Sequence, residues 1–229
     1  MFNRLSREEL VFQLYGLLRG AFWVSNPYDV KKAENKSLQL EVAKSVGFDI
    51  PLTTTTSSPE KAIEFRKKSG RIVTKALVKH LVRKGKKYHS FFTFRIPVEM
   101  GVDFSLLPIS PAIFQEEIDR QYDIRCVVVR DQVFSLAIHQ VGTKTGDVDY
   151  RTGSSKDLIF EPCILPKDVE RKCVNFVKFF DLHYSSIDLI LGKDSKYYFL
   201  ENNPCGAWVF VEINGKYNIS QAIASLFNN

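Results

Sequence analysis

Two segments of the sequence have the pattern of β-hairpins, and they restrict the fold more than any other feature. Residues 123–140 carry two apolar runs around a turn at Arg130–Gln132, and residues 186–202 carry two more around the turn GKDSK. A hairpin joins antiparallel neighbours. Because helical patterns lie between the strand pairs rather than after each strand, we expect an α+β fold with mixed, largely antiparallel sheets.

Helical periodicity and capping signals predict five helices. The first is expected to use Ser6 as its N-cap. The second is expected to run without a break from Asp29 to Gly47. All five fall within residues 6–22, 29–47, 57–70, 165–182 and 218–227. Extended segments are expected in residues 48–56, 71–79, 88–96 and 112–118. The stretch VRKGKK and residues 142–156 are typical of loops.

Composition removes several classes of protein. The chain has 229 residues, 45% of them hydrophobic, which is enough to bury a substantial core. No apolar run approaches the ~18 residues of a membrane span, and the N-terminus is too polar for a signal peptide. The four cysteines form no C-x-x-C pair and have no zinc-finger spacing, so we expect reduced thiols in a cytoplasmic protein.

Net charge is +6, and basic residues concentrate between Arg66 and Lys87. This cluster has two interpretations. It is either a solvated helix end and loop, or a positive field for an anionic ligand such as nucleic acid, nucleotide phosphates or an acidic peptide. Charge alone does not choose between them.

The stretch YYFLENNP places an acid and two amides at the end of an apolar strand. Strict alternation would put Tyr197, Phe199, Glu201 and Asn203 on one face and Asn202 on the other. The hairpin folds Asp188 back toward Glu201. Three oxygen donors then converge, a set that suits Mg²⁺ held together with substrate phosphates. The alternative is a capped strand end, with both amides in a turn before the proline.

Other charged residues support the metal interpretation. Lys75 lies inside an apolar strand, where lysine is uncommon unless it is paired or meets a ligand. Lys36 follows Asn35 on a helix, Arg125 follows Asp123, and Arg151 follows Asp149. Together with a two-carboxylate metal site, these cations form a set suited to a triphosphate, since phosphoryl transfer needs mainly positioning and charge neutralisation.

On these residues the sequence resembles the ATP-grasp ligases, from about Trp23 to the C-terminus. The matching segments are NKSLQL, IVTKAL, FQEEI, DIRCVVV, DYR and the hairpin with the pattern Asp…Glu-x-Asn. NNPCGAW and the final ISQAIASL helix resemble the subfamily that matures ribosomal peptides into graspetides, including the microviridin-type maturases. That subfamily often has Gly-Gln-Trp where this sequence has Gly206-Ala207-Trp208.

The resemblance implies a role for each matching position. Asp188, Glu201 and Asn203 would hold two Mg²⁺ ions, and Lys36 and Lys75 would contact ATP phosphates. Four consecutive residues would form the nucleotide-binding segment, the last three lining the adenine and ribose: Gln115, Glu116, Glu117 and Ile118. Arg125 and Arg151 would be catalytic, stabilising the leaving phosphate or the acceptor carboxylate.

The implied reaction turns a carboxylate into an acyl phosphate with ATP, after which an amine or hydroxyl displaces phosphate. In graspetide maturases both groups are side chains of one precursor peptide, Asp or Glu against Lys, Ser or Thr. We therefore expect such a peptide as partner, with a homodimer or a second ATP-grasp protein as a further possibility. A membrane partner is not expected.

The resemblance also implies a domain plan. Residues 25–117 and 118–229 would be the central and C-terminal ATP-grasp subdomains, which enclose ATP between them. Family members usually carry another N-terminal α/β domain, so we expect residues 1–24 to be the remnant of one, and activity of the chain alone stays open.

Three other functions remain. The chain is alternatively a ligase of glutamate-ligase type that joins free amino acids to a peptide or protein. It is otherwise a non-catalytic ATP-grasp protein that binds a peptide, or a basic nucleic-acid-binding module.

Overall fold

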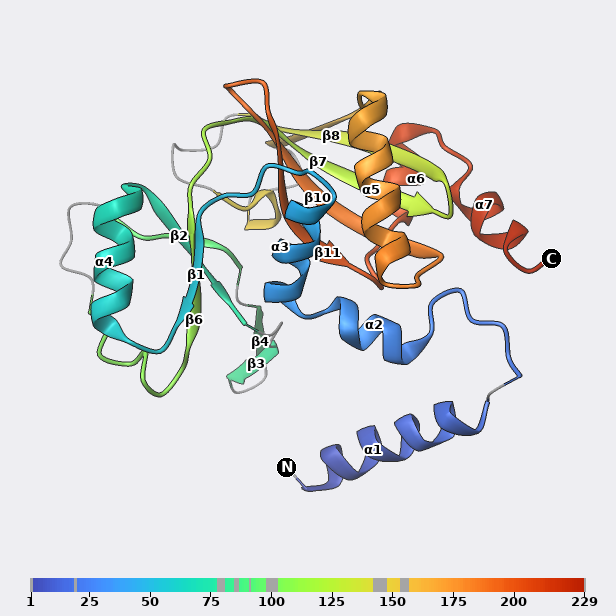
Figure 1. The fold of residues 1–229 in the computed structure, drawn as a ribbon, viewed down its shortest axis with the longest axis horizontal. Helices are drawn as coiled ribbons and strands as arrows, with labels where there is room; N and C mark the ends of the chain where they lie inside the picture. Colours follow the sequence, from blue (N-terminus) through green and yellow to red (C-terminus); the bar gives the residue numbers. More distant parts are fainter. Residues whose placement is uncertain are drawn as a thin grey trace.

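The strands of the protein form two large antiparallel sheets and one short hairpin (Figure 1). The computed structural model describes residues 2–18, 20–77, 81–84, 87–90, 92–97, 103–141, 148–152 and 157–228. The sheets have four, five and two strands, and every pair of named strands is antiparallel. The expected α+β class is confirmed.

The five-stranded sheet has the order β11-β10-β7-β8-β9 and contains both predicted hairpins. Its strands are β7 (Arg120–Val129), β8 (Gln132–Gln140), β9 (Leu158–Cys163), β10 (Tyr184–Gly192) and β11 (Tyr197–Asn203). The turns place Arg130 and Ser195 at positive φ angles of 51° and 65°. Strand β9 was not predicted.

The four-stranded sheet has the order β1-β6-β2-β5. Its strands are β1 (Thr53–Thr56), β2 (Ile72–Ala76), β5 (Phe94–Arg95) and β6 (Ala112–Glu116), and β3 (Leu81–Lys84) pairs separately with β4 (Lys87–Ser90). Two predictions were wrong here. VRKGKK supplies strand residues on both sides of 85–86, which lie outside the described residues. The single strand expected over 88–96 is divided between β4 and β5, because they pair with different partners.

The helices are α1 (Phe2–Leu17), α2 (Pro27–Ala33), α3 (Lys36–Ser45), α4 (Pro59–Ser69), α5 (Lys167–Phe179), α6 (Val209–Gly215) and α7 (Ile219–Ser225). Helices α2, α3 and α4 begin at side-chain caps, which are Asn26, Asn35 and Ser58. The predicted helix from Asp29 to Gly47 is in fact α2 and α3, because the Asn35 side chain accepts a hydrogen bond from the Leu38 N–H and starts a new helix. Ser6 lies inside α1 and is not its cap, and α6 was not predicted.

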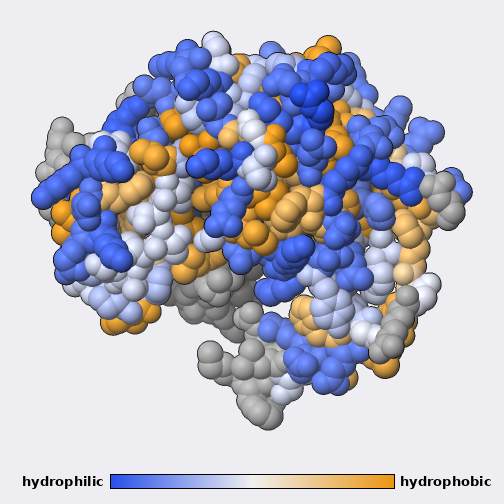
Figure 2. All heavy atoms as spheres, viewed as in Figure 1, coloured by the Kyte–Doolittle hydropathy of each residue, from blue (hydrophilic) through white to orange (hydrophobic). Residues whose placement is uncertain are grey.

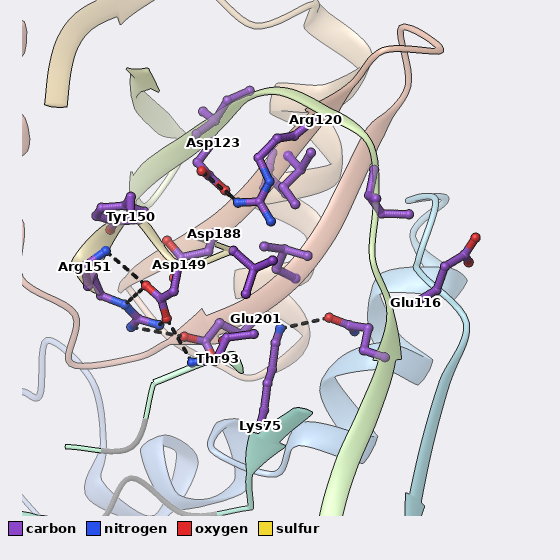
Figure 3. A pocket seen from close by; sticks show the side chains of 17 residues that line it. Lys75, Thr93, Glu116, Arg120, Asp123, Asp149, Tyr150, Arg151, Asp188 and Glu201 are labelled. Atoms are coloured by element: carbon purple, nitrogen blue, oxygen red, sulfur yellow. Dashed lines mark hydrogen bonds and ion pairs between the residues drawn. The ribbon is translucent and has the colours of Figure 1, made fainter. Parts of the chain in front are cut away.

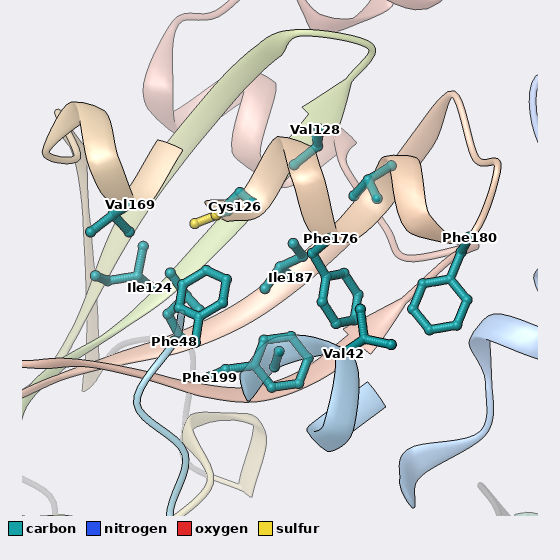
Figure 4. Close-up of a cluster of buried hydrophobic side chains, with 14 of the residues drawn as sticks. Val42, Phe48, Ile124, Cys126, Val128, Val169, Phe176, Phe180, Ile187 and Phe199 are labelled. Carbon is teal, nitrogen blue, oxygen red and sulfur yellow. The ribbon is translucent and has the colours of Figure 1, made fainter. Parts of the chain in front are cut away.

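One face of the five-stranded sheet packs against α5 and α3 (Figure 4). Alternate residues of β7, such as Ile124 and Cys126, meet Val42 of α3 and Phe176 of α5 in this core. Phe176 and Phe199 are fully buried, with ring centroids 4.8 Å apart. Helix α5 is amphipathic, so burial of its apolar side holds it on the sheet.

The other face of this sheet is only partly covered by helices. Val127 and Val129 of β7 pack against α6 and α7 through Val211 and Ile219. Arg125 lies earlier on the same strand and, by alternation, on the same face as Val127. The two C-terminal helices therefore leave one end of this face for charged side chains.

The expected subdomain boundary at residue 117 stays a prediction. Helices α2 and α3, which were expected to belong with residues 25–117, share the hydrophobic core of the five-stranded sheet. Figure 2 shows hydrophilic residues over the region where α4 lies, and Lys67 and Lys68 of that helix are exposed. No described helix is long and apolar enough to cross a membrane. Residues 142–147 and 153–156 of the expected loop lie outside the described residues.

Candidate active site

The β10–β11 hairpin brings the two predicted carboxylates together. Asp188 and Glu201 are direct cross-strand partners, but the next pair is Leu189 with Phe199, so Leu200 forms a β-bulge. The bulge changes which residues face the core. Tyr197 and Phe199 pack into the core beside α5, whereas Glu201 faces the opposite side. The prediction that these residues share one face with Glu201 was therefore wrong.

Asn203 completes the expected donor set. Its Nδ2 lies 3.2 Å from Asp188 Oδ2 and 3.4 Å from Glu201 Oε1. Asn202 points away, as predicted, and its Oδ1 accepts a hydrogen bond from the Ser185 hydroxyl at 2.5 Å. The strand thus changes from apolar to polar at the bulge and not by simple alternation.

Two cations balance the buried carboxylates. Arg125 Nε lies 3.0 Å from Asp188 Oδ1, and Lys36 Nζ lies 2.8 Å from Glu201 Oε2. The pKa values of the two acids nevertheless shift in opposite directions. Burial raises the pKa of Asp188 to about 6, with Arg125 opposing the shift and Glu201 adding to it. Burial also disfavours the charged form of Glu201, but Lys36 and Lys75 outweigh it and hold the pKa of Glu201 well below its usual range.

Lys75 reaches the site from the smaller sheet. Its Nζ donates to Gln115 Oε1 at 2.9 Å, across the β2–β6 pair, and Gln115 Nε2 donates to the Thr53 hydroxyl at 3.0 Å. Burial lowers the pKa of Lys75, and Glu201 opposes this shift. A desolvated ammonium beside a carboxylate suits an additional anionic group, because a phosphate would replace part of the lost hydration.

The carboxylate of Asp149 holds the Arg151 guanidinium in place. Its Nε and Nη2 donate to the two carboxylate oxygens of Asp149 at 2.7 and 2.6 Å, and Thr93 N–H donates to Asp149 Oδ2 at 3.2 Å. Arg151 Nη1 lies 3.8 Å from Glu201 Oε1. The planar pairing with Asp149 orients the guanidinium toward the carboxylate pair.

These residues line an open pocket of about 600 Å³ between the two large sheets (Figure 3). Seven of the predicted site residues line it: Lys75, Gln115, Glu116, Ile118, Arg151, Asp188 and Glu201. Lys75 and Glu201, which are 126 positions apart in the sequence (201 − 75), therefore meet in one pocket.

Four predicted residues lie beside the pocket. Arg125 is behind Asp188 and donates through Nη2 to the Tyr150 hydroxyl at 3.2 Å. Lys36 and Asn203 line a neighbouring groove, next to the Lys36–Glu201 ion pair. Glu117 pairs with Arg95, with Nε donating to Oε2 at 2.6 Å. The individual roles of the predicted residues stay predictions.

Sequence reasoning missed one charged pair on the pocket wall. Arg120 Nη1 donates to both oxygens of Asp123, at 2.9 and 3.0 Å, and Gln140 Nε2 donates to Asp123 Oδ2 at 3.3 Å. Burial raises the pKa of Asp123, and the neighbouring Arg120 opposes this shift. Acidic and basic residues three positions apart are common on surfaces, so spacing alone could not identify this pair. Asp149 had a better signal, since it stands two residues before Arg151.

Residues 101–226 match the family described as RimK-like ATP-grasp domain. The chain belongs to this ATP-grasp family. No curated protein matches the sequence. The family assignment confirms the predicted fold, and ATP-grasp ligases use ATP and Mg²⁺.

Three solved structures of ATP-grasp proteins are similar to the chain. A Chryseobacterium gregarium RiPP-associated ATP-grasp ligase, in complex with ADP and a leader and core peptide, is 26% identical with a TM-score of 0.88, covering 98% of this chain and 69% of that one. Macrocyclase MdnC from Microcystis aeruginosa MRC, bound with precursor peptide MdnA, is 29% identical with a TM-score of 0.83, covering 98% and 70%. Macrocyclase MdnB from the same organism is 32% identical with a TM-score of 0.75, covering 97% and 67%.

The residues of the ATP-grasp site fit Mg²⁺. Among the described residues no three His, Cys, Asp or Glu side chains form a group that could hold a metal, so the carboxylates of Asp188 and Glu201 need the amide of Asn203 as third donor. A half-turn of that carboxamide presents Oδ1 in place of Nδ2. An all-oxygen set of this kind is what Mg²⁺ prefers.

Proposed function

We propose that the protein is an ATP- and Mg²⁺-dependent ligase that closes rings in a peptide by joining one of its side-chain carboxylates to a side-chain amine or hydroxyl. One observation carries this proposal. Asp188 and Glu201 meet Lys75, Arg151 and Lys36 around one pocket, in a family of carboxylate ligases. The similar solved structures include a macrocyclase bound with its precursor peptide, which supports a peptide as substrate.

The proposed reaction has two steps, a phosphoryl transfer from ATP and then an acyl transfer. A carboxylate oxygen of the peptide attacks the γ-phosphorus of ATP, the bond to the β-phosphate oxygen breaks, and ADP leaves. The amine or hydroxyl then attacks the acyl carbon, inorganic phosphate leaves with the acyl C–O bonding pair, and the nucleophile loses its proton. The peptide therefore loses one water for each ring, as an amide or an ester.

The chain's own residues have complementary tasks in this scheme. Lys75 and Arg151 would neutralise charge on the transferring phosphoryl group, since both line the pocket and act electrostatically on Glu201. Gln115, Glu116 and Ile118 would hold the nucleotide base and ribose. Arg125 would keep Asp188 oriented from behind. Asp188, Glu201 and Asn203 would hold Mg²⁺, which would supply positive charge to neutralise the phosphates.

The substrate peptide we propose is rich in Asp or Glu and in Thr, Ser or Lys. The +6 net charge and the cations around the pocket favour an acidic partner. The free cysteines suit a reducing compartment, and we propose the bacterial cytoplasm. A homodimer or a partner ATP-grasp protein stays a prediction.

The test is a reaction with ATP, Mg²⁺ and a peptide of the proposed composition. We expect ADP to form only when the peptide is present, with loss of one water per ring by mass spectrometry. A gain of whole amino-acid residues would instead indicate a ligase for free amino acids. Peptide binding without ADP formation would indicate a non-catalytic protein. Either result would reject the ring-closing function.

A further inference from the structure

Gln39 of α3 is a buried amide that contacts the end of β11. It is 2% exposed, and its Oε1 accepts a hydrogen bond from the Asn202 N–H at 2.9 Å. Its Nε2 donates to the Asn202 carbonyl at 3.0 Å and to the Ala33 carbonyl at 2.6 Å. Both Nε2 hydrogens and Oε1 are therefore used. Burial of a carboxamide costs free energy unless its donors and acceptor are paired, and here all of them are.

The position of β11 explains what these bonds replace. Among the described residues, β11 is at the edge of the five-stranded sheet, with β10 as its strand neighbour and an isolated bridge from Asp49 to Tyr198 on its outer side. Backbone groups on its outer edge have no strand to pair with. The Gln39 carboxamide carries a donor and an acceptor, like a peptide group, and it pairs with the N–H and C=O of Asn202. The side chain of Gln39 thus pairs with the edge of β11 in the way that a residue of a neighbouring strand would.

Asn202 lies between two residues of the candidate metal site. Glu201 precedes it and Asn203 follows it, so fixing both backbone groups of Asn202 also fixes the backbone from which those side chains extend. The Ser185 hydroxyl holds the Asn202 side chain from β10. Lys36, about one turn before Gln39 on the same helix, forms the ion pair with Glu201. Helix α3 therefore holds this strand end at two points.

We infer that Gln39 is a positioning residue that sets the metal-binding geometry of Glu201 and Asn203 through the backbone of Asn202. This inference rests on the proposed ATP- and Mg²⁺-dependent function, because it assigns a task within the same site. Gln39 itself touches neither carboxylate. Its effect on the reaction passes through the strand, so replacing it changes the site and leaves the predicted metal donors present.

The test compares two variants of α3. Gln39→Leu keeps the approximate volume and removes all three hydrogen bonds. Val42→Ala, the matched control, creates a cavity one turn later in the same helix, at a residue that is 3% exposed and packs in the core. Gln39→Glu is the second variant, for use if the leucine variant does not fold. Its carboxylate can still accept from the Asn202 N–H, but it has no donor for the carbonyls of Asn202 and Ala33.

The first readout is hydrogen exchange at the Asn202 amide, which needs no substrate. We expect exchange to become at least about tenfold faster in Gln39→Leu, and little changed in Val42→Ala beyond its loss of stability. The second readout is the affinity for Mn²⁺ with ADP by calorimetry. We expect it to fall by about ten- to a hundredfold in the Gln39 variants, as for other residues that orient metal ligands.

Several outcomes would overturn the inference. Unchanged hydrogen exchange at the Asn202 amide in Gln39→Leu would show that the Gln39 hydrogen bonds do not hold the end of β11. An equal loss of Mn²⁺–ADP affinity in Val42→Ala would show that the effect is one of stability alone. A wild-type chain that binds Mn²⁺–ADP and closes no ring would count against the proposed function only. A wild-type chain that binds no Mn²⁺–ADP would overturn both.

Discussion

At one end of the five-stranded sheet, the two faces are built from the same strands and have opposite character, although the second face is apolar where it meets α6 and α7. On one face, residues such as Ile124 and Ile187 lie in a core closed by α5. On the other, their neighbours Arg125 and Asp188 are also almost fully buried, yet they are charged. The difference teaches that alternate positions of one strand can serve stability and chemistry separately, with only the peptide backbone in common.

The energetics of the two faces differ accordingly. Burying a phenylalanine or leucine side chain contributes about 1.5–3 kcal/mol. A buried ion pair such as Arg125 with Asp188 roughly breaks even, because the cost of removing both charges from water offsets their attraction. The charged end of this face is thus not explained by folding alone, and the proposed binding of phosphate and metal would give those charges a function.

The largest expected effect is on the polar face. Glu201→Gln keeps the shape of the side chain and removes its charge, so we expect turnover to fall at least about a thousandfold, equivalent to about 4 kcal/mol in the barrier. The assay is ADP formation with peptide, and circular dichroism should show an intact fold. The control is Glu161→Gln on β9, whose side chain is 64% exposed. Undiminished turnover in the Glu201 variant would reject the metal assignment.

Phe176→Ala tests the apolar face. We expect unfolding free energy to fall by about 3–4 kcal/mol, because the ring is fully buried against Phe199 and Phe180. Denaturant titration measures the change. Phe227→Ala, at a residue that is 61% exposed, should cost less than about 1 kcal/mol. A similar loss in both variants would contradict the division of labour between the faces.

Asp188→Asn tests how Asp188 makes the stability of the protein depend on pH. In the metal-free protein the pKa of Asp188 is raised from 3.8 to about 6, so the folded state binds its proton more tightly than the unfolded state. This group therefore lowers the free energy of unfolding as pH rises from about 4 to about 6, by about 3 kcal/mol in total. Asparagine should remove that decline.

The measurement is denaturant unfolding at several pH values with a metal chelator present. Asp131→Asn, at an exposed acid with a side chain 74% accessible, is the comparison and should leave the decline unchanged. If the free energy of unfolding of Asp188→Asn depends on pH as in the wild type, the pKa of Asp188 is not raised by its surroundings.

The smallest effect is expected for Arg151→Lys. Lysine keeps the positive charge and loses the two-point contact with Asp149, so we expect about a tenfold lower kcat with little change in stability. Steady-state kinetics of ADP formation measures this. Arg171→Lys, on the exposed side of α5, should match wild type. Equal kinetics in the two variants would show that charge alone is needed at residue 151.

The hairpin itself was predictable, and its detail was not. Alternating apolar residues around GKDSK predict the pairing, and the structure places Asp188 directly opposite Glu201. The bulge at Leu200 has no signature in a pattern of period two, because one extra residue changes the face of everything before it. Alternation therefore placed Phe199 beside Glu201 when it lies in the core.

The helices show the same limit. Apolar periodicity continues through residues 29–47, so it does not reveal the break that Asn35 makes by capping α3. Asparagine within a helical pattern is ambiguous, since the same side chain is tolerated in a helix and favoured at its start. The Arg120–Asp123 pair was missed for a related reason, because burial cannot be read from charge spacing. Residues that act through long-range contacts, such as Gln39, need the tertiary structure.

The outer edge of β11 also bears on self-association. An uncovered edge strand offers free backbone groups to strands of other molecules and is a common starting point for aggregation. Here Phe199 N–H donates to the Asp49 carbonyl at 2.9 Å, and Gln39 pairs with Asn202 three residues later. The segment from α3 to Asp49 therefore protects the strand that carries Glu201 and Asn203 from pairing with another chain.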